Sequence, residues 1–203
     1  ETGEMRFWTQ QEYETFVEKV ADKEETYMAF EILYWCGVRL GELLALTPED
    51  FDLEKNSLRI NKSLQRIHGE DVITDPKTPK SRRVIIMPEF LTLEVKEYLS
   101  HLYKVGPTDR IFCISKSFLH HEMDRGVKLS GVKRIRIHDL RHSHVSLLIN
   151  MGFSALAIGN RVGHEAVDIT YRYAHLFPSI QTEMASELNK EREAILNVAK
   201  EQR

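Results

Sequence analysis

The chain has 203 residues, which is enough to bury a hydrophobic core as one domain or at most two small ones. It is 42% hydrophobic and 29% charged, as globular proteins are, and no apolar run approaches the length of a transmembrane helix. The opening Glu1-Thr2-Gly3-Glu4 is neither a signal peptide nor an initiator methionine, so we expect a fragment of a longer polypeptide. Cys36 and Cys113, without a metal-ligand spacing, predict a reduced cytoplasmic protein with two buried thiols.

The net charge of −3 alone argues against a nucleic-acid partner, but the charges are segregated along the chain. Residues 1–31 carry nine acidic and three basic residues, whereas Arg125–Arg141 carries six basic residues and one acidic residue. Lys62–Arg83 carries six basic and three acidic residues. Such a chain can present a basic face despite its negative total, although solvated loop charges would give the same pattern.

Two helices are predicted near the start of the chain. Thr9-Gln10-Gln11-Glu12 forms a capping box that opens an amphipathic helix to about Val20. A second helix, from about Glu25 to Cys36, is rich in large apolar residues, and Gly37 is placed to end it in the left-handed conformation.

A third helical stretch, Val38–Leu46, begins with an arginine between two buried helices. An unpaired guanidinium is costly there, so Arg39 either pairs with Glu42, one turn further on, or binds an anionic ligand. The spacing favours the pairing with Glu42 and leaves both interpretations open.

The hydrophobic period then changes to that of strands. Ser57–Ile67, Val72–Thr74 and Arg83–Met87 predict a small three-stranded antiparallel sheet at one edge of a helical domain. Asp75–Arg83 is predicted to be a basic hairpin tip that reaches a DNA groove or backbone. The expected fold class is therefore mainly α with this small sheet, an α+β arrangement.

Helices are predicted again over Glu89–Tyr103 and about Phe118–Leu129. The stretch Ile137–His144 then leads into the apolar run Val145–Met151. One helical face gathers apolar residues and His144, and another gathers imidazole and guanidinium groups that suit a phosphate near a helix N-terminus. The apolar face consists of Leu140, His144, Leu147, Leu148 and Met151, and the polar face of His138, Arg141 and His142.

The last third of the chain predicts three more helical segments. They cover Ala155–Val162, Asp168–Ala174 and about Ser179–Lys200, the last with only a thin apolar stripe.

Five short stretches occur in the order, and with similar gaps, seen in the tyrosine recombinase (phage integrase) family. They are Gly37–Glu42, the hairpin from Pro76-Lys77-Thr78 to Arg83, His138-Asp139-Leu140-Arg141-His142, Val162-Gly163-His164 and Tyr173–Pro178. The chain thus resembles the catalytic domain of that family. The resemblance implies six catalytic residues: Arg39, Lys77, His138, Arg141, His164 and Tyr173.

The resemblance implies that Tyr173 attacks a DNA phosphodiester, forming a 3′-phosphotyrosyl bond and freeing a 5′-hydroxyl, without metal, nucleotide or other cofactor. A tyrosine of ordinary pKa is barely ionised at neutral pH, so His138 is expected to act as general base. Tyr171 is a rival nucleophile, but the Tyr-x-His context favours Tyr173.

The scissile phosphate would be held by the cationic residues. Arg39 and Arg141 would clamp its nonbridging oxygens bidentately, with a hydrogen bond from His164. Lys77 would protonate the departing 5′-oxygen.

Further residues are expected to support the site or bind DNA. The supporting residues are Glu42, Asp139, His142 and His175. The expected DNA contacts are Lys80, Arg82, Arg83, Lys133, Arg134 and Arg136. His138 and His142 share the spacing of a zinc motif, but its glutamate is missing and Arg141 would repel a cation, so no metal is expected.

The resemblance implies an N-terminal core-binding domain that completes a clamp around the duplex, and we expect this domain to lie outside residues 1–203. We expect residues 1–203 to be a single catalytic domain. The resemblance of its last helix to the family's C-terminal docking segment implies that it works on double-stranded DNA sites as a homo-tetramer. The polar segment 179–203 is expected to dock on a neighbouring protomer, with folding back in cis left open.

The resemblance favours an integrase of a phage, transposon or conjugative element in the bacterial cytoplasm, associated with the nucleoid when on DNA, over a chromosome-dimer resolvase. A type IB topoisomerase-like enzyme that relaxes DNA as a monomer is an alternative. A relative that binds DNA without chemistry is another.

Overall fold

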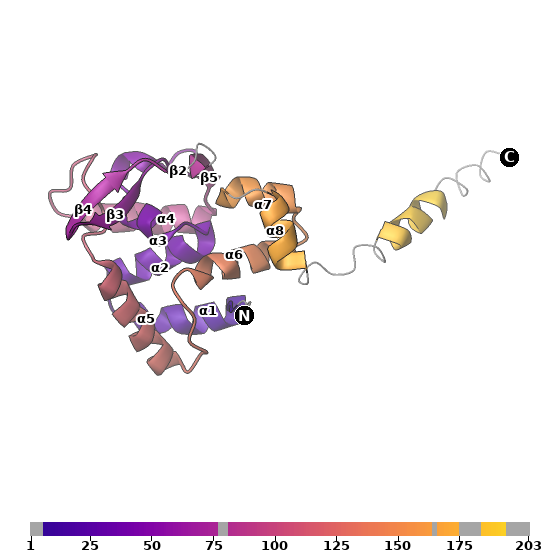
Figure 1. Ribbon diagram of the computed structural model, residues 1–203, viewed down its shortest axis with the longest axis horizontal. Helices are drawn as coiled ribbons and strands as arrows, with labels where there is room; N and C mark the ends of the chain where they lie inside the picture. The colour runs from indigo at the N-terminus through magenta and orange to yellow at the C-terminus, as the bar shows by residue number, and fades with distance from the viewer. Residues whose placement is uncertain (1–5, 77–80, 164–165, 175–183, 194–203) are drawn as a thin grey trace.

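The structure, a computed structural model, describes residues 6–76, 81–163, 166–174 and 184–193 (Figure 1). The α-helices are α1 (Gln10–Val17), α2 (Glu24–Cys36), α3 (Leu40–Leu44), α4 (Glu89–His101), α5 (Lys116–Ser130), α6 (Asp139–Asn150), α7 (Ala155–Val162) and α8 (Ala166–Tyr173), with a further helix over 184–193. Short 3-10 helices are η1 (Glu18–Val20) and η2 (Pro48–Asp50). The strands are β1 (Phe51–Asp52), β2 (Ser57–Ile60), β3 (Ser63–Ile67), β4 (Glu70–Thr74) and β5 (Arg83–Ile86).

Helix α2 lies at the centre of the fold and is buried on almost every side. The predicted capping box of α1 forms, with Thr9 and Glu12 each bonding the other's backbone N–H. Gly37 ends α2 with a φ of 62°, as its position predicts. A Cβ on Gly37 would lie 2.6 Å from the ring of His144, so this turn needs glycine for packing as well as for its backbone conformation.

Helix α6 packs against α2, and its surroundings differ from the prediction. Rather than one apolar face, most of its length is buried, including His142, Ser143 and His144, while the predicted core residue Met151 is 63% exposed. The extended segment before α1 explains part of this burial. The backbone N–H of Trp8 donates to Ser143 Oγ at 2.9 Å, and its indole donates to the carbonyl of Lys133 at 2.8 Å.

The small antiparallel sheet is confirmed, but its strands differ from those predicted. The predicted strand Ser57–Ile67 breaks at Asn61-Lys62 into β2 and β3, which enter different sheets. A three-stranded sheet has the order β1-β2-β5, and β3 pairs with β4 in a separate hairpin. Lys62 turns inward at the break and pairs with the buried Asp50 at 2.6 Å.

Two hydrophobic clusters make up the core. The larger joins α1–α5, the sheet and the start of α6, and a smaller one joins the end of α6 to α7 and α8. Tyr173 is part of the smaller cluster. Cys36 is buried as predicted, whereas Cys113 is exposed, which corrects the expectation of two buried thiols. Every helix in the described part is too short or too polar to cross a membrane.

Candidate active site

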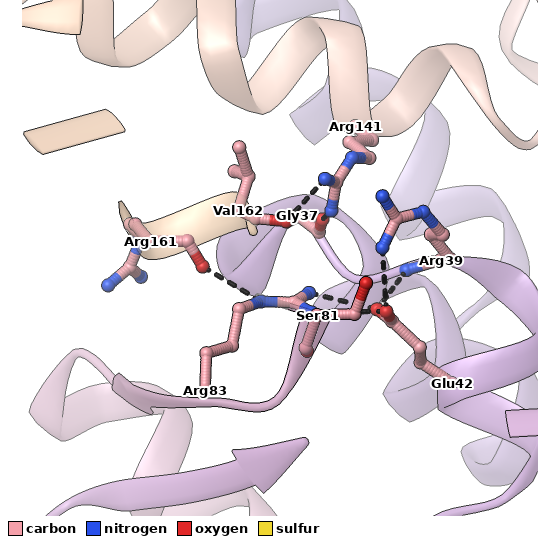
Figure 2. A network of polar contacts seen from close by, with 8 residues as sticks. All are labelled: Gly37, Arg39, Glu42, Ser81, Arg83, Arg141, Arg161 and Val162. Carbon is pink, nitrogen blue, oxygen red and sulfur yellow. Dashed lines mark hydrogen bonds and ion pairs between the residues drawn. The ribbon is translucent and has the colours of Figure 1, made fainter. Parts of the chain in front are cut away.

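The carboxylate of Glu42 binds two guanidinium groups, those of Arg39 and Arg83 (Figure 2). Glu42 accepts the backbone N–H of Arg39 at 2.8 Å and its side chain at 2.9 Å. It also accepts two bonds from Arg83, at 3.0 and 2.8 Å. Burial raises the pKa of this carboxyl, but Arg83 and Arg39 outweigh burial and lower it to about 2. Arg39 thus forms the pair with Glu42 that the spacing favoured, and this pair does not exclude an anionic ligand.

Arg83 is correspondingly not a DNA contact. Its side chain is only 4% exposed, and besides Glu42 it binds the carbonyls of Arg161 and Ser81, each at 3.0 Å. A guanidinium enclosed in this way is not accessible to a DNA backbone, which corrects the expectation from the sequence. The alternation of β5 puts Arg83 on the inward side of the sheet.

Arg141 lies beside Arg39 (Figure 2) and is held by main-chain carbonyls. It donates from Nη1 to the carbonyl of Gly37 at 2.6 Å and from Nη2 to the carbonyl of Val162. Burial, followed by the nearby Arg39 and Arg83, lowers the pKa of Arg141 to about 9. Among the described residues it has no carboxylate partner within ion-pair distance.

These groups leave a local excess of positive charge. Three guanidinium groups, from Arg39, Arg83 and Arg141, face one carboxylate, Glu42, so their formal charges sum to about +2. Arg39 keeps 36% of its side chain exposed, so an anion can approach from that side. This arrangement is suited to hold a phosphate.

Asp139 organises the start of α6. Its carboxylate is 1% exposed and accepts the backbone N–H of Arg136 at 2.8 Å and three bonds from the Arg136 guanidinium. Burial raises the pKa of Asp139, but the bonds from Arg136 outweigh burial and lower it. His138, directly before the helix, remains exposed, with its ring edge-on to that of His142 at 5.1 Å between centroids.

Tyr173 is buried at 4% exposure, and its hydroxyl contacts Nδ1 of His142. Burial raises the pKa of Tyr173 to about 12, although Arg141 and Arg172 pull it down. Burial, followed by His138, lowers the pKa of His142 to about 4, so its imidazole is neutral at pH 7. The histidine in contact with the phenol is His142, whereas the sequence predicted that His138 would act on it. Tyr171 is 81% exposed and lies outside this contact.

The structure thus brings together Arg39, His138, Arg141 and Tyr173 of the predicted catalytic residues, with the supporting residues Glu42, Asp139 and His142. Four predicted residues lie outside the described part: Lys77, Lys80, His164 and His175. Within the described part, no three His, Cys, Asp or Glu side chains are grouped as a metal site requires.

The remaining predicted DNA contacts are surface arginines and a lysine in ion pairs. Arg82 pairs with Asp75 at 2.9 Å, Lys133 with Glu12 at 3.4 Å, and Arg134 with Asp124 at 2.8 Å. Arg136 keeps 74% of its side chain exposed while it binds Asp139. The pairs of Arg82, Lys133 and Arg134 are exposed and therefore weak, so these three cations can exchange their partners for phosphates.

Arg161 has a structural role that the sequence did not indicate. Its guanidinium binds His144 Nε2 at 3.0 Å, the carbonyl of Trp35 at 3.0 Å and the carbonyl of Ile86 at 2.9 Å. It thereby fixes α7, whose Val162 carbonyl holds Arg141, against α2, α6 and β5. A lone arginine in an amphipathic helix carries no sequence signal for such a role.

A mainly helical fold that brings two arginines, a histidine and a buried tyrosine together is that of a tyrosine recombinase catalytic domain. The model of the Phage integrase family matches residues 6–179, and the chain belongs to this family.

Among the relatives, the ICEBs1 integrase of Bacillus subtilis (strain 168) is 32% identical over 200 residues, covering 91% of this chain and 54% of that protein. The integrase of Staphylococcus phage L54a is 29% identical over 180 residues, covering 80% of this chain and 51% of that protein. The chain spans about half the length of these curated relatives.

The fold is similar to that of solved recombinases. The Tn1549 transposon integrase in complex with circular intermediate DNA superposes with a TM-score of 0.75 at 20% identity, covering 92% of this chain and 68% of that one. XerA recombinase superposes with a TM-score of 0.68 at 24% identity, covering 92% and 65%.

Proposed function

We propose that this chain is the catalytic domain of a site-specific DNA recombinase, an integrase of a mobile genetic element. It cleaves and rejoins DNA through a 3′-phosphotyrosyl intermediate without metal or nucleotide. The observation that supports this most strongly is the anion site formed by Arg39 and Arg141 near the buried hydroxyl of Tyr173. The integrase relatives and the DNA complex of the Tn1549 integrase support DNA as the substrate.

The charges of the site fit the demands of the reaction. Negative charge develops on the nonbridging oxygens as the phosphate is attacked, and preorganised guanidinium groups stabilise it without reorganising. Arg141 is preorganised by the carbonyls of Gly37 and Val162, and Arg39 by Glu42. In the proposal, Lys77 protonates the departing 5′-oxygen and His164 binds a nonbridging oxygen.

Strand exchange between two DNA sites requires several protomers, and we propose a homo-tetramer on DNA. The helix over 184–193 is exposed throughout, with Met184 at 53% and Leu188 at 70%, and it projects from the other helices (Figure 1). A groove of about 290 Å³ lined by Leu148, Phe153, Ala157, Ile158 and Arg161 offers an apolar surface of matching kind. Glu187 and Glu191 on that helix complement the arginine in the groove.

We propose that this helix docks in the groove of a neighbouring protomer. Replacing Leu188 and Met184 with Ser would then reduce tetramers on paired sites while single-site cleavage continues. Replacing the exposed Leu129 with Ser is a matched control, because it lies on α5, away from both surfaces.

The activity is tested by trapping. A pool of nicked duplexes with randomised sequence is incubated with the whole protein that contains this chain, and covalent adducts are recovered and sequenced. The nick lets the cleaved fragment diffuse away, so the phosphotyrosyl adduct accumulates. An adduct that depends on Tyr173 supports the proposal, and its absence under all conditions contradicts it.

A topoisomerase-like activity predicts a different pattern. A monomer would relax supercoiled DNA of arbitrary sequence, whereas a recombinase produces recombinants only from paired sites. The sequence recovered by trapping supplies those sites. Relaxation without recombinants would favour the topoisomerase alternative.

A further inference from the structure

We infer that His142 is the group that takes the phenolic proton of Tyr173 when it attacks the phosphate, and that Asp139 is the positioning residue that orients the His142 ring. The inference rests on the proposed function, since it assigns a proton acceptor within that reaction. It also changes the role of His138, for which the sequence predicted general-base catalysis.

The contact between the two side chains involves the reacting atom itself. Nδ1 of His142 touches Oη of Tyr173, and the two ring centroids lie 5.8 Å apart at an interplanar angle of 51°. Both side chains are buried, so water has little access to the contact. Helix α6 supplies the histidine and α8 the tyrosine, and their packing through the smaller core cluster holds the pair together.

The other ring nitrogen of His142 faces a fixed carboxylate. Its Nε2 lies 3.9 Å from Oδ1 of Asp139, one helical turn earlier. Asp139 has little freedom to move, because Arg136 binds both its carboxylate oxygens and Ser143 Oγ donates to its carbonyl at 2.9 Å. A negative charge at this position favours the tautomer with hydrogen on Nε2, which leaves the Nδ1 lone pair free to accept from the phenol.

His138 has different surroundings. Its side chain is exposed, its ring lies edge-on to that of His142, and the guanidinium groups of Arg141 and Arg39 are its neighbours. The described contacts of Tyr173 Oη are with His142, not with His138. This position suits His138 to bind the phosphate that the arginines hold.

The proton transfer is balanced as follows. The bond from Tyr173 Oη to phosphorus forms while the bond from phosphorus to the 5′-oxygen breaks, and the phenolic proton moves to Nδ1 of His142. The departing 5′-oxygen takes its proton from Lys77. In rejoining, the 5′-hydroxyl attacks phosphorus and gives its proton to the neutral amine of Lys77. The bond from phosphorus to Tyr173 Oη breaks, and the proton on His142 returns to the phenolate oxygen. The charged and titratable groups around His142 are His138, Asp139, Arg136 and Arg141.

The test separates removal of the nucleophile's proton from protonation of the leaving group. Two nicked duplexes carry the trapped target sequence and differ only at the scissile 5′ position, where one has the natural bridging oxygen and the other a bridging sulfur. A thiolate leaves without a proton, so sulfur compensates for loss of a general acid but not for loss of a general base. Single-turnover cleavage by the whole protein is measured on both.

We expect His142→Asn to cleave both substrates about 10²–10⁴-fold more slowly than the parent, the usual range for loss of an acid–base group. Lys77→Ala is the matched control, and its defect should largely disappear with sulfur. Added imidazole should partly restore His142→Ala. The inference is overturned if His142→Asn cleaves the oxygen substrate at the parent rate, or if sulfur removes its defect.

His138→Asn makes the same change four residues earlier. This variant should bind the phosphate more weakly, and its cleavage rate should recover at saturating DNA concentration. The assignment would be contradicted if His138→Asn, and not His142→Asn, cleaved both the oxygen and the sulfur substrate slowly. Unchanged thermal midpoints show that each variant is folded. If the parent forms no adduct with either substrate, the proposed function fails as well.

A measurement without DNA tests the geometry independently. Nitrogen-15 NMR of the histidine rings should show that His142 carries hydrogen on Nε2 and accepts a hydrogen bond at Nδ1. The Tyr173→Phe substitution should change the chemical shift of Nδ1. Asp139→Asn should raise the population of the other tautomer. Hydrogen on Nδ1 of His142 in the parent would overturn the inference, whatever the DNA experiments give.

Discussion

Arg83 donates two hydrogen bonds to the carboxylate of Glu42, at 3.0 and 2.8 Å, and both side chains are almost completely buried. The pair joins β5 to α3 and leaves Glu42 able to hold Arg39 at the edge of the anion site. The position of Arg39, a proposed catalytic residue, therefore depends on a buried ion pair.

Breaking this pair from one side should destabilise the protein strongly. Arg83→Met leaves the Glu42 carboxylate buried with only Arg39, and we expect the free energy of unfolding in urea to fall by about 3–5 kcal/mol. Replacing both residues, Arg83→Met with Glu42→Gln, should cost less than the single change, because no buried carboxylate is left without its partner. A single variant as stable as the parent would show that the pair is not what fixes this region.

Acid should weaken the fold through the same carboxylate. The folded-state pKa of Glu42, about 2, lies below the value of 4.5 for a free glutamate, so its contribution is complete above pH 4.5 and is lost as the pH falls towards 2. The contribution amounts to about 3 kcal/mol at neutral pH. Between pH 6 and pH 2.5, the free energy of unfolding measured in urea should therefore fall less steeply for Glu42→Gln than for the parent. Parallel curves would argue against this role of Glu42.

A methyl group at Gly37 should disturb both packing and catalysis. In Gly37→Ala the added methyl group would clash with the ring of His144, and alanine would have to adopt a φ of 62°. The carbonyl of residue 37 also accepts a hydrogen bond from Arg141. We expect a loss of stability of about 1–3 kcal/mol or more and slower cleavage. Gly131→Ala is the matched control, because it has a φ of 74° but no atoms within 4 Å of the added carbon. Equal effects at the two positions would exclude a packing role for Gly37.

Arg141 should not tolerate lysine. Arg141→Lys keeps the charge but cannot bind the carbonyls of Gly37 and Val162 and the phosphate together. Loss of one such donor raises the barrier by about 2.7–4 kcal/mol, so single-turnover cleavage should fall about 10²–10³-fold. Arg66→Lys, at an exposed pair with Asp71, serves as the control and should change cleavage little. Near-parent cleavage by Arg141→Lys would mean that charge alone suffices.

Local sequence signals predicted most helices and their ends. The box at Thr9 and Glu12 forms, Gly37 ends its helix, and α7 covers the predicted residues. Strand pairing was predicted less well, because alternation indicates a strand but not its partner. The break at Lys62 depends on an ion pair with Asp50, a contact that no local pattern reveals.

The candidate site shows the same limit. Helical spacing placed His138 and His142 on one face, but the identity of the histidine that meets Tyr173 depends on where α8 packs, 31 residues further along the chain. Likewise, strand character at Arg83 did not reveal that this arginine turns inward to Glu42. Motifs identified the residue types of the site, whereas tertiary packing assigned their partners.

The most direct measurement is intact mass and peptide mapping of the covalent adduct on the trapped nicked duplex. The account predicts an adduct on Tyr173, full adduct with Tyr171→Phe, and none with Tyr173→Phe, which should still bind the duplex with nearly the parent affinity. An adduct formed by Tyr173→Phe, or mapped to the exposed Tyr171, would contradict the central claim that the buried phenol beside the arginine pair is the nucleophile.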